Sequence, residues 1–126
     1  SLRRMNQRPT SQQIFDNIID SIRERKGQEI TIVDLSANPS AAASEFIICQ
    51  GRSSTQVDAI ADNIREQLWE RIGVKPYNYD GYANSQWIII DYGDTMVHVF
   101  QPEVRSRYNL EDLWSDAVIT KLPDED

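Results

Sequence analysis

One stretch, residues 87–100, constrains the fold of this chain more than any other. Two runs rich in apolar residues flank Gly93 and Asp94. A two-residue loop that begins with glycine indicates a β-hairpin, because glycine adopts positive φ angles without steric cost. Side chains alternate along each strand, so the hairpin has two faces. The facing pairs of the first face are Tyr92 with Thr95, Ile90 with Val97, and Ile88 with Val99. Those of the second are Asp91 with Met96, Ile89 with His98, and Trp87 with Phe100.

The two faces differ in chemistry. The first is mainly aliphatic, which is typical of a protein core. The second combines two aromatic rings, a carboxylate, a methionine and the only histidine of the chain. The second face therefore needs an explanation beyond packing.

Further elements follow from apolar periodicity and from capping residues. A first helix is expected to begin at Thr10 or Ser11 and to stop at Gly27 in the left-handed conformation. A second helix is expected after a capping box of Ser53 and Gln56, ending at Gly73. A third helix is expected over 103–114. The expected strands are residues 29–35, residues 45–50 covered on both faces, and an edge strand within 74–80 that contains Pro76.

This order of elements predicts an α/β fold, with a mixed sheet of about five strands and helices packed on it. Residues 10–115 are expected to form a single domain. We expect residues 1–9 to be a flexible lead and residues 116–126 to be a partly loose, acidic tail.

The charge balance disfavours nucleic acid as the main contact. The 126 residues include 13 basic and 20 acidic side chains, a formal net charge of −7, whereas phosphate binding requires lysine and arginine. A basic protein partner is favoured instead. No apolar run approaches the roughly 20 residues that span a membrane, no signal peptide is recognisable, and Cys49 is a single cysteine inside an apolar run. A cytoplasmic protein is expected.

Three patterns resemble catalytic or ligand sites, and each has a simpler explanation. The turn from Gly51 to Ser54 lacks the lysine and the second glycine of a phosphate-binding loop, so helix capping is favoured. Asp91, His98 and a serine would need triad geometry that a residue inventory does not supply, so His98 is interpreted as structural or interfacial. Asp91 and Asp94 can bind a magnesium ion, but aspartates at turns usually accept hydrogen bonds from local amides. No catalytic residue, cofactor or metal is therefore predicted.

Three stretches of the chain, 46–57, 87–100 and 103–114, together resemble the ribosomal silencing factors, also called Iojap-related proteins. The second and third stretches are quite specific in their order and spacing, and the resemblance covers about residues 10–115. It implies a nucleotidyltransferase-like α/β fold without catalytic acids. It also implies binding to the large ribosomal subunit through its ribosomal protein fourteen, which would sterically block subunit joining and repress translation. In organelles the resemblance implies a link to subunit assembly.

The leading hypothesis is thus a ribosome-binding protein without enzymatic activity. We expect the second hairpin face to bind the partner, with an apolar centre and a rim formed by Asp91 and Asp94. The expected centre consists of Trp87, Ile89, Met96, His98 and Phe100. The alternatives are a residual nucleotide-binding or nucleotidyltransferase-like enzyme, a large-subunit assembly factor, and a homodimer that uses the same face.

Overall fold

The computed structural model describes residues 8–114 and 116–125. The strands are β1 (Gln28–Asp34), β2 (Glu45–Gln50), β3 (Asn78–Asp80), β4 (Trp87–Asp91), β5 (Thr95–Phe100) and β6 (Val118–Lys121). The helices are α2 (Ser11–Glu24), α3 (Ser54–Ile72), α4 (Pro102–Tyr108) and α5 (Leu110–Leu113). Residues 1–7 of the expected flexible lead lie outside the described residues.

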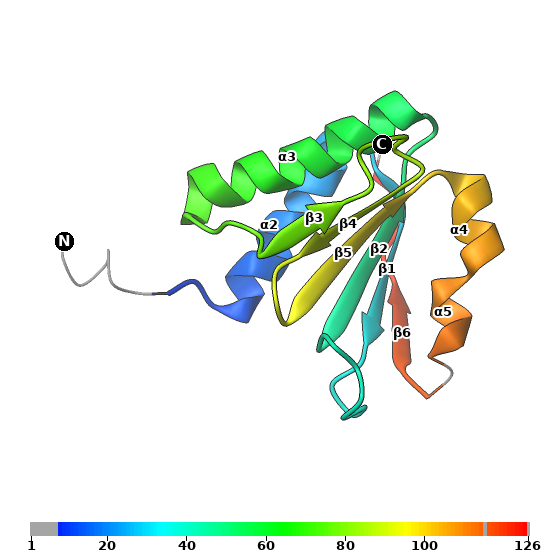
Figure 1. Cartoon of the computed structure of the whole chain (residues 1–126). Helices are drawn as coiled ribbons and strands as arrows, with labels where there is room; N and C mark the ends of the chain where they lie inside the picture. The colour runs from blue at the N-terminus through cyan, green and yellow to red at the C-terminus, as the bar shows by residue number, and fades with distance from the viewer. Residues whose placement is uncertain (1–7, 115, 126) are drawn as a thin grey trace.

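The strands form one mixed sheet in the order β3-β4-β5-β2-β1-β6 (Figure 1). Strands β2 and β5 run parallel, and the other neighbouring pairs are antiparallel. The expected α/β class with a mixed sheet is confirmed, with six strands in place of about five. In the described part of the chain, none of the helices is long and apolar enough to cross a membrane.

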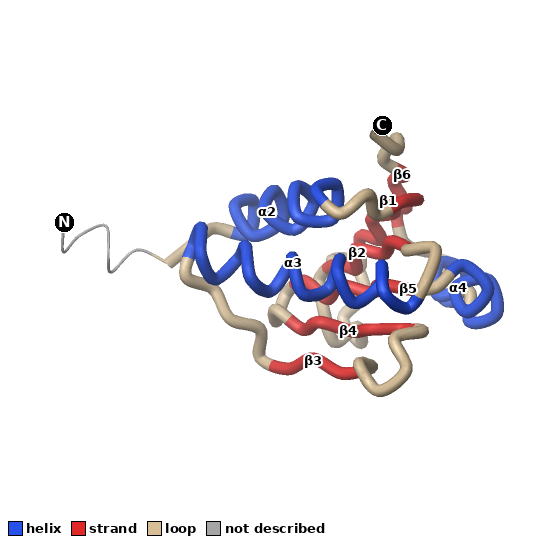
Figure 2. The backbone as a smooth tube through the Cα atoms, turned by 90° about the horizontal axis from the view of Figure 1, so that it is seen from above, coloured by secondary structure: helices blue, strands red, loops and turns tan. Residues whose placement is uncertain are grey.

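Helices α2 and α3 lie side by side across one face of the sheet (Figure 2). They cover the aliphatic face of the hairpin, where Ile88 pairs with Val99 and Ile90 pairs with Val97, as predicted. These four side chains are fully buried. Tyr92 and Thr95 flank the turn and are joined by a hydrogen bond from the Tyr92 N–H to the Thr95 carbonyl at 2.9 Å. The first face of the hairpin is therefore the main core.

The end of α2 differs from the prediction. Thr10 caps the helix start in a capping box with Gln13, but the residue in the left-handed conformation at the helix end is Lys26, with φ of 61°, and not Gly27. Gly27 is required for a different reason: a Cβ atom there would collide with the Cγ2 atom of Ile22. The glycine allows the chain to turn tightly against its own helix.

The expected helix over 103–114 is broken into α4 and α5. Asn109 lies between them with φ of 50°, a left-handed conformation that asparagine tolerates better than most residues. Its N–H donates to the Arg105 carbonyl at 2.8 Å, which ends α4. The break turns the chain, so that α4 and α5 follow the face of the sheet opposite α2 and α3 (Figure 1).

The segment expected to be a partly loose acidic tail contains strand β6. Residues 118–121 pair with residues 31–34 of β1, and the Leu122 side chain packs against the main core. Beyond the strand, Asp124 accepts a hydrogen bond from the Glu29 N–H at 2.8 Å, and Glu125 forms an ion pair with Arg23 at 3.3 Å. The acidic residues are thus tied to basic and N–H groups elsewhere in the fold.

Candidate functional site

The second face of the hairpin continues across the whole sheet in cross-strand rows. Pairing places six residues in one row: Asn78, Asp91, Met96, Phe46, Val33 and Ile119. The next row holds Asp80, Ile89, His98, Ile48, Thr31 and Lys121. Helices α4 and α5 pack over Val33, Ile48 and Phe100. Phe46 and Trp87 pack at the edge of this cluster, whereas Ile89 of β4 and Met96 of β5 lie outside it.

His98 lies inside an aromatic cluster on this face. The Trp87 Nε1–H donates a hydrogen bond to His98 Nδ1 at 3.0 Å, and the Phe46 ring meets the imidazole edge to face with centroids 4.7 Å apart. Only 3% of the histidine is exposed. Burial lowers the pKa of His98 to about 4, so the imidazole is neutral at physiological pH and fixes the orientation of Trp87.

The carboxylate near His98 accepts a hydrogen bond from the adjacent turn. Asp91 Oδ1 accepts a hydrogen bond from the Gly93 N–H at 2.8 Å, which confirms the predicted turn role of this aspartate. His98 Nε2 is enclosed and has no partner within the described residues.

Burial also raises the pKa of the Cys49 thiol to about 12, which keeps it protonated and a poor nucleophile. Within the described residues, no group of three or more metal-ligating side chains gathers.

The turn from Gly51 to Ser54 serves the helix, as predicted. Ser53 Oγ accepts from the Gln56 N–H at 3.1 Å. The second half of the predicted capping box is replaced: Gln56 Oε1 accepts from the Arg52 N–H at 2.7 Å, and its amide nitrogen donates to the carbonyls of Arg25 and Lys26. Gln56 thereby fastens the start of α3 to the end of α2.

Arg105 holds α4 and α5 against the sheet. Its guanidinium pairs with Glu111 of α5 at 3.1 Å. It also donates to the Glu29 carbonyl at 2.7 Å, to Thr31 Oγ1 at 2.9 Å and to Gln50 Oε1 at 3.2 Å. One side chain therefore links both short helices to strands β1 and β2.

The open part of the second face carries a continuous group of half-buried and exposed apolar side chains, which we call the apolar patch. It consists of Phe46, Trp87, Ile89, Met96 and Tyr108. The Tyr108 ring, 52% exposed, lies 4.8 Å from the Trp87 ring, and Trp87 also stacks on Phe100 at 4.9 Å. Aromatic and methionine side chains are enriched at protein interfaces.

The structure distributes the seven predicted partner-binding residues over three environments. Trp87, Ile89 and Met96 are half-buried in the apolar patch, with half-buried Asp91 beside Met96. His98 and Phe100 are buried and support the patch from beneath. Asp94 is exposed at the tip of the hairpin, where its carbonyl accepts from the Ser44 and Glu45 N–H groups.

Sequence reasoning did not include Phe46 and Tyr108 in this face. Phe46 reaches it because parallel strand β2 pairs with β5 and places Phe46 opposite Met96, a long-range register that hairpin rules do not supply. Tyr108 reaches it because the break at Asn109 ends α4 at this point. For Tyr108, the available signal was the concentration of aromatic residues in the last third of the chain.

Comparison with known proteins gives a consistent result. The family model described as "Ribosomal silencing factor during starvation" matches residues 8–126. "Ribosomal silencing factor RsfS" of Bacillus subtilis is 38% identical over 99 residues, which cover 79% of this chain and 82% of that protein. The protein of the same name from Halalkalibacterium halodurans is 33% identical over 113 residues, which cover 90% of this chain and 95% of that protein.

The solved structures agree. The crystal structure of a Chromobacterium violaceum protein superposes with a TM-score of 0.79 and 33% identity, covering 85% of this chain and 88% of that chain. Fold, sequence and family model therefore lead to one conclusion. The chain belongs to the family of ribosomal silencing factors.

Proposed function

We propose that the chain binds the large ribosomal subunit through its ribosomal protein fourteen and, without catalysing a reaction, blocks the small subunit from joining. The observation that carries this proposal is the apolar patch of Phe46, Trp87, Ile89, Met96 and Tyr108, present in a member of the ribosomal silencing factor family. Translation is repressed because the two subunits cannot assemble while the factor occupies their contact region.

The patch has the composition expected of a binding surface. Trp, Tyr and Met side chains are typical of interface centres, and tryptophan and tyrosine frequently carry much of the binding energy. Trp87 is held in place by the hydrogen bond to His98 and by the Phe100 ring, so little side-chain freedom is lost on binding. A standard interface of roughly 800 Å² per partner is within reach of one open sheet face and its neighbouring loops.

The charge of the chain favours a protein contact over an RNA contact. With a net charge of −7, the factor is repelled by ribosomal RNA and attracted by a basic ribosomal protein. Asp91, in the same row as Met96, and Asp80, in the same row as Ile89, place carboxylates beside the apolar side chains. These carboxylates favour a partner with basic groups around an apolar centre.

The proposal is tested by sedimentation with purified large subunits. The double variant Ile89→Ala with Met96→Ala is expected to bind at least tenfold more weakly, because removing interface side chains costs about 1–2 kcal/mol each at a hot spot. Trp69→Ala is the matched control, because Trp69 is 53% exposed on α3, which packs on the opposite face of the sheet. Both variants are checked for a cooperative thermal transition like that of the wild type.

Two further measurements complete the test. In a subunit-joining assay, the wild type is expected to lower the yield of whole ribosomes and the double variant to lose this effect. In a pull-down, purified ribosomal protein fourteen is expected to be retained by the wild type. Equal binding of wild type and double variant would show that another surface binds, and failure of the wild type to sediment with large subunits would overturn the proposal.

A further inference from the structure

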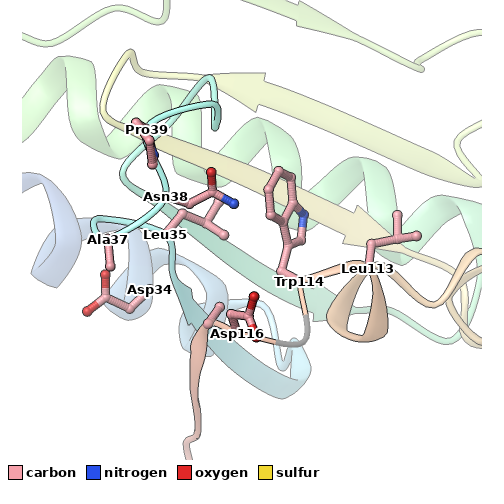
Figure 3. A pocket seen from close by; sticks show the side chains of 9 residues that line it. Asp34, Leu35, Ala37, Asn38, Pro39, Leu113, Trp114 and Asp116 are labelled. Carbon is pink, nitrogen blue, oxygen red and sulfur yellow. The ribbon is translucent and has the colours of Figure 1, made fainter.

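A groove lies beside the apolar patch, between the end of β1 and the end of α5. Its volume is about 410 Å³, within the range of roughly 300–1,000 Å³ that is typical of ligand pockets. One wall is the loop after β1, and the other is formed by Leu113, Trp114, Asp116 and Ala117. Figure 3 shows the Trp114 indole opposite the loop that carries Asn38 and Pro39, with Asp116 below the two.

Hydrogen bonds within the loop hold this wall of the groove in place. Leu35, only 2% exposed, anchors it, and the Leu35 N–H donates to the Ser44 carbonyl at 2.8 Å. The Asn38 N–H donates a hydrogen bond to the Leu35 carbonyl at 2.9 Å, and Asn38 Oδ1 accepts one from the Ser40 N–H at 3.0 Å. These bonds hold the loop in a compact shape, so the groove keeps its width without an occupant.

The lining has a defined chemistry. It combines the Trp114 indole and aliphatic surface with the carboxylate of Asp116, and its described residues include no basic side chain. Asp34 also lines the groove, but its carboxylate points away from the indole in Figure 3. Asp34 accepts from the Ser36 N–H at 2.9 Å. The exposed Asp116 carboxylate has no hydrogen-bond or ion-pair partner among the described residues, and in Figure 3 it lies below the indole.

We propose that this groove receives an arginine side chain from a protein of the large ribosomal subunit. The inference rests on the proposed function and adds a second anchor to it. A guanidinium is planar, stacks on the face of an indole, and forms paired hydrogen bonds with a carboxylate. Trp114 and Asp116 supply these two partners at one site, and Pro39 and Ala117 provide apolar surface for the methylene groups of the arginine.

The groove adjoins the apolar patch. Trp114 meets Phe46 of the patch edge to face, with ring centroids 6.1 Å apart, and both residues pack against the same buried cluster. A protein seated on Met96 and Phe46 can therefore reach across Phe46 into the groove. Because Asp116 repels phosphate and the described lining residues include no basic side chain, ribosomal RNA is a poor occupant.

The first experiment compares Asp116→Asn with Asp20→Asn in sedimentation with purified large subunits at several salt concentrations. Both substitutions remove one negative charge from an exposed position, but Asp20 lies on α2, which packs on the opposite face of the sheet. Asp116→Asn is expected to weaken binding threefold to tenfold and to reduce its salt dependence, whereas Asp20→Asn should resemble the wild type. Equal behaviour of the two variants would overturn the groove proposal.

The second experiment identifies the occupant. Leu113, 69% exposed at the groove edge, is replaced by the photo-crosslinking residue p-benzoylphenylalanine, and Trp69 is replaced in the same way as a control. After irradiation with large subunits, Leu113 is expected to crosslink to a ribosomal protein, at a peptide that contains arginine. A crosslink to ribosomal RNA alone, or none above the Trp69 control, would overturn the proposal.

The outcomes separate the two proposals. If the Ile89 and Met96 double variant loses binding while Asp116→Asn keeps it, the proposed function stands and the groove proposal fails. If the wild type does not sediment with large subunits, both fail. If both sets of variants bind weakly and Leu113 crosslinks to protein, the patch and the groove form one surface.

Discussion

The two faces of the sheet differ in how far helices cover them and in which side chains they carry. The face beneath α2 and α3 is closed, and its hairpin core of isoleucine and valine is fully buried. The opposite face is covered by α4 and α5 at one end only, and its open part mixes aromatic, methionine and carboxylate side chains with Ile89. A closed aliphatic face contributes stability through burial. A face left partly open retains apolar surface that only a partner can cover.

Adjacent residues on one strand belong to the two different faces. Ile90 is fully buried under α3, whereas Ile89 is half-buried in the apolar patch. The same substitution at the two positions should therefore affect different properties. Each prediction below tests this separation, beginning with the largest expected effect.

We expect Ile90→Ala to lower the free energy of unfolding by about 2–5 kcal/mol, because it removes buried methyl groups and leaves a cavity. Ile89→Ala should cost roughly 1 kcal/mol or less, because the Ile89 side chain is already partly in contact with water. Urea denaturation measures both values. Binding to large subunits should show the reverse order once it is corrected for the folded fraction, and equal effects at the two positions would refute the division between the faces.

His98 should make the second face sensitive to acid. Burial lowers the pKa of His98 to about 4, whereas an unfolded histidine titrates near 6.5. Between these values the unfolded chain binds a proton that the folded chain does not, so the free energy of unfolding falls as the pH decreases from 6.5 to 4. The total loss is up to about 3 kcal/mol.

His98→Gln isolates this contribution when urea denaturation is repeated from pH 7.5 to 4.5. The variant should lose less stability than the wild type over this interval. Glu24 and Asp34, whose pKa values are lowered mainly by hydrogen bonds from Asn63 and Ser36, titrate in both proteins, so their effect cancels in the difference. Parallel pH curves for the two proteins would show that His98 does not control the slope.

The smallest effect is expected from Trp87→Phe. The substitution keeps an aromatic ring against Phe100 but removes the indole N–H that donates to His98 Nδ1. An unpaired buried nitrogen costs about 1–2 kcal/mol. Trp114→Phe is the matched control, because Trp114 packs on Phe46 at the groove edge and is only partly buried. A larger loss of stability in the control would contradict the proposed support of Trp87 by His98.

Local patterns predicted much of the fold. The turn at Gly93 and Asp94, the pairing of Ile90 with Val97 and the caps at Thr10, Ser53 and Gly73 depend on neighbouring residues, and the structure confirms them. Strand β6 and the pairing of Phe46 with Met96 depend on segments far apart in sequence. Periodicity within a short window contains no information on such pairings.

The candidate site was predicted in part for the same reason. The unequal hairpin faces identified Trp87, Ile89 and Met96, because strand alternation is local. Whether His98 is accessible depends on Phe46 of another strand and on the short helices after the hairpin. The break between α4 and α5 requires a left-handed Asn109, which an uninterrupted helical pattern over 103–114 does not reveal.

The groove has a consequence for the folding of the protein during its synthesis. One wall comes from residues 34–39 and the other from Leu113, Trp114, Asp116 and Ala117, so the groove cannot exist until the later segment has been synthesised and has left the exit tunnel. Because a domain generally folds as a unit, we expect the main core and the groove to be completed together, after the later segment has left the tunnel. A growing chain therefore lacks the groove, so the surface that we propose for binding is complete only after the later segment has emerged.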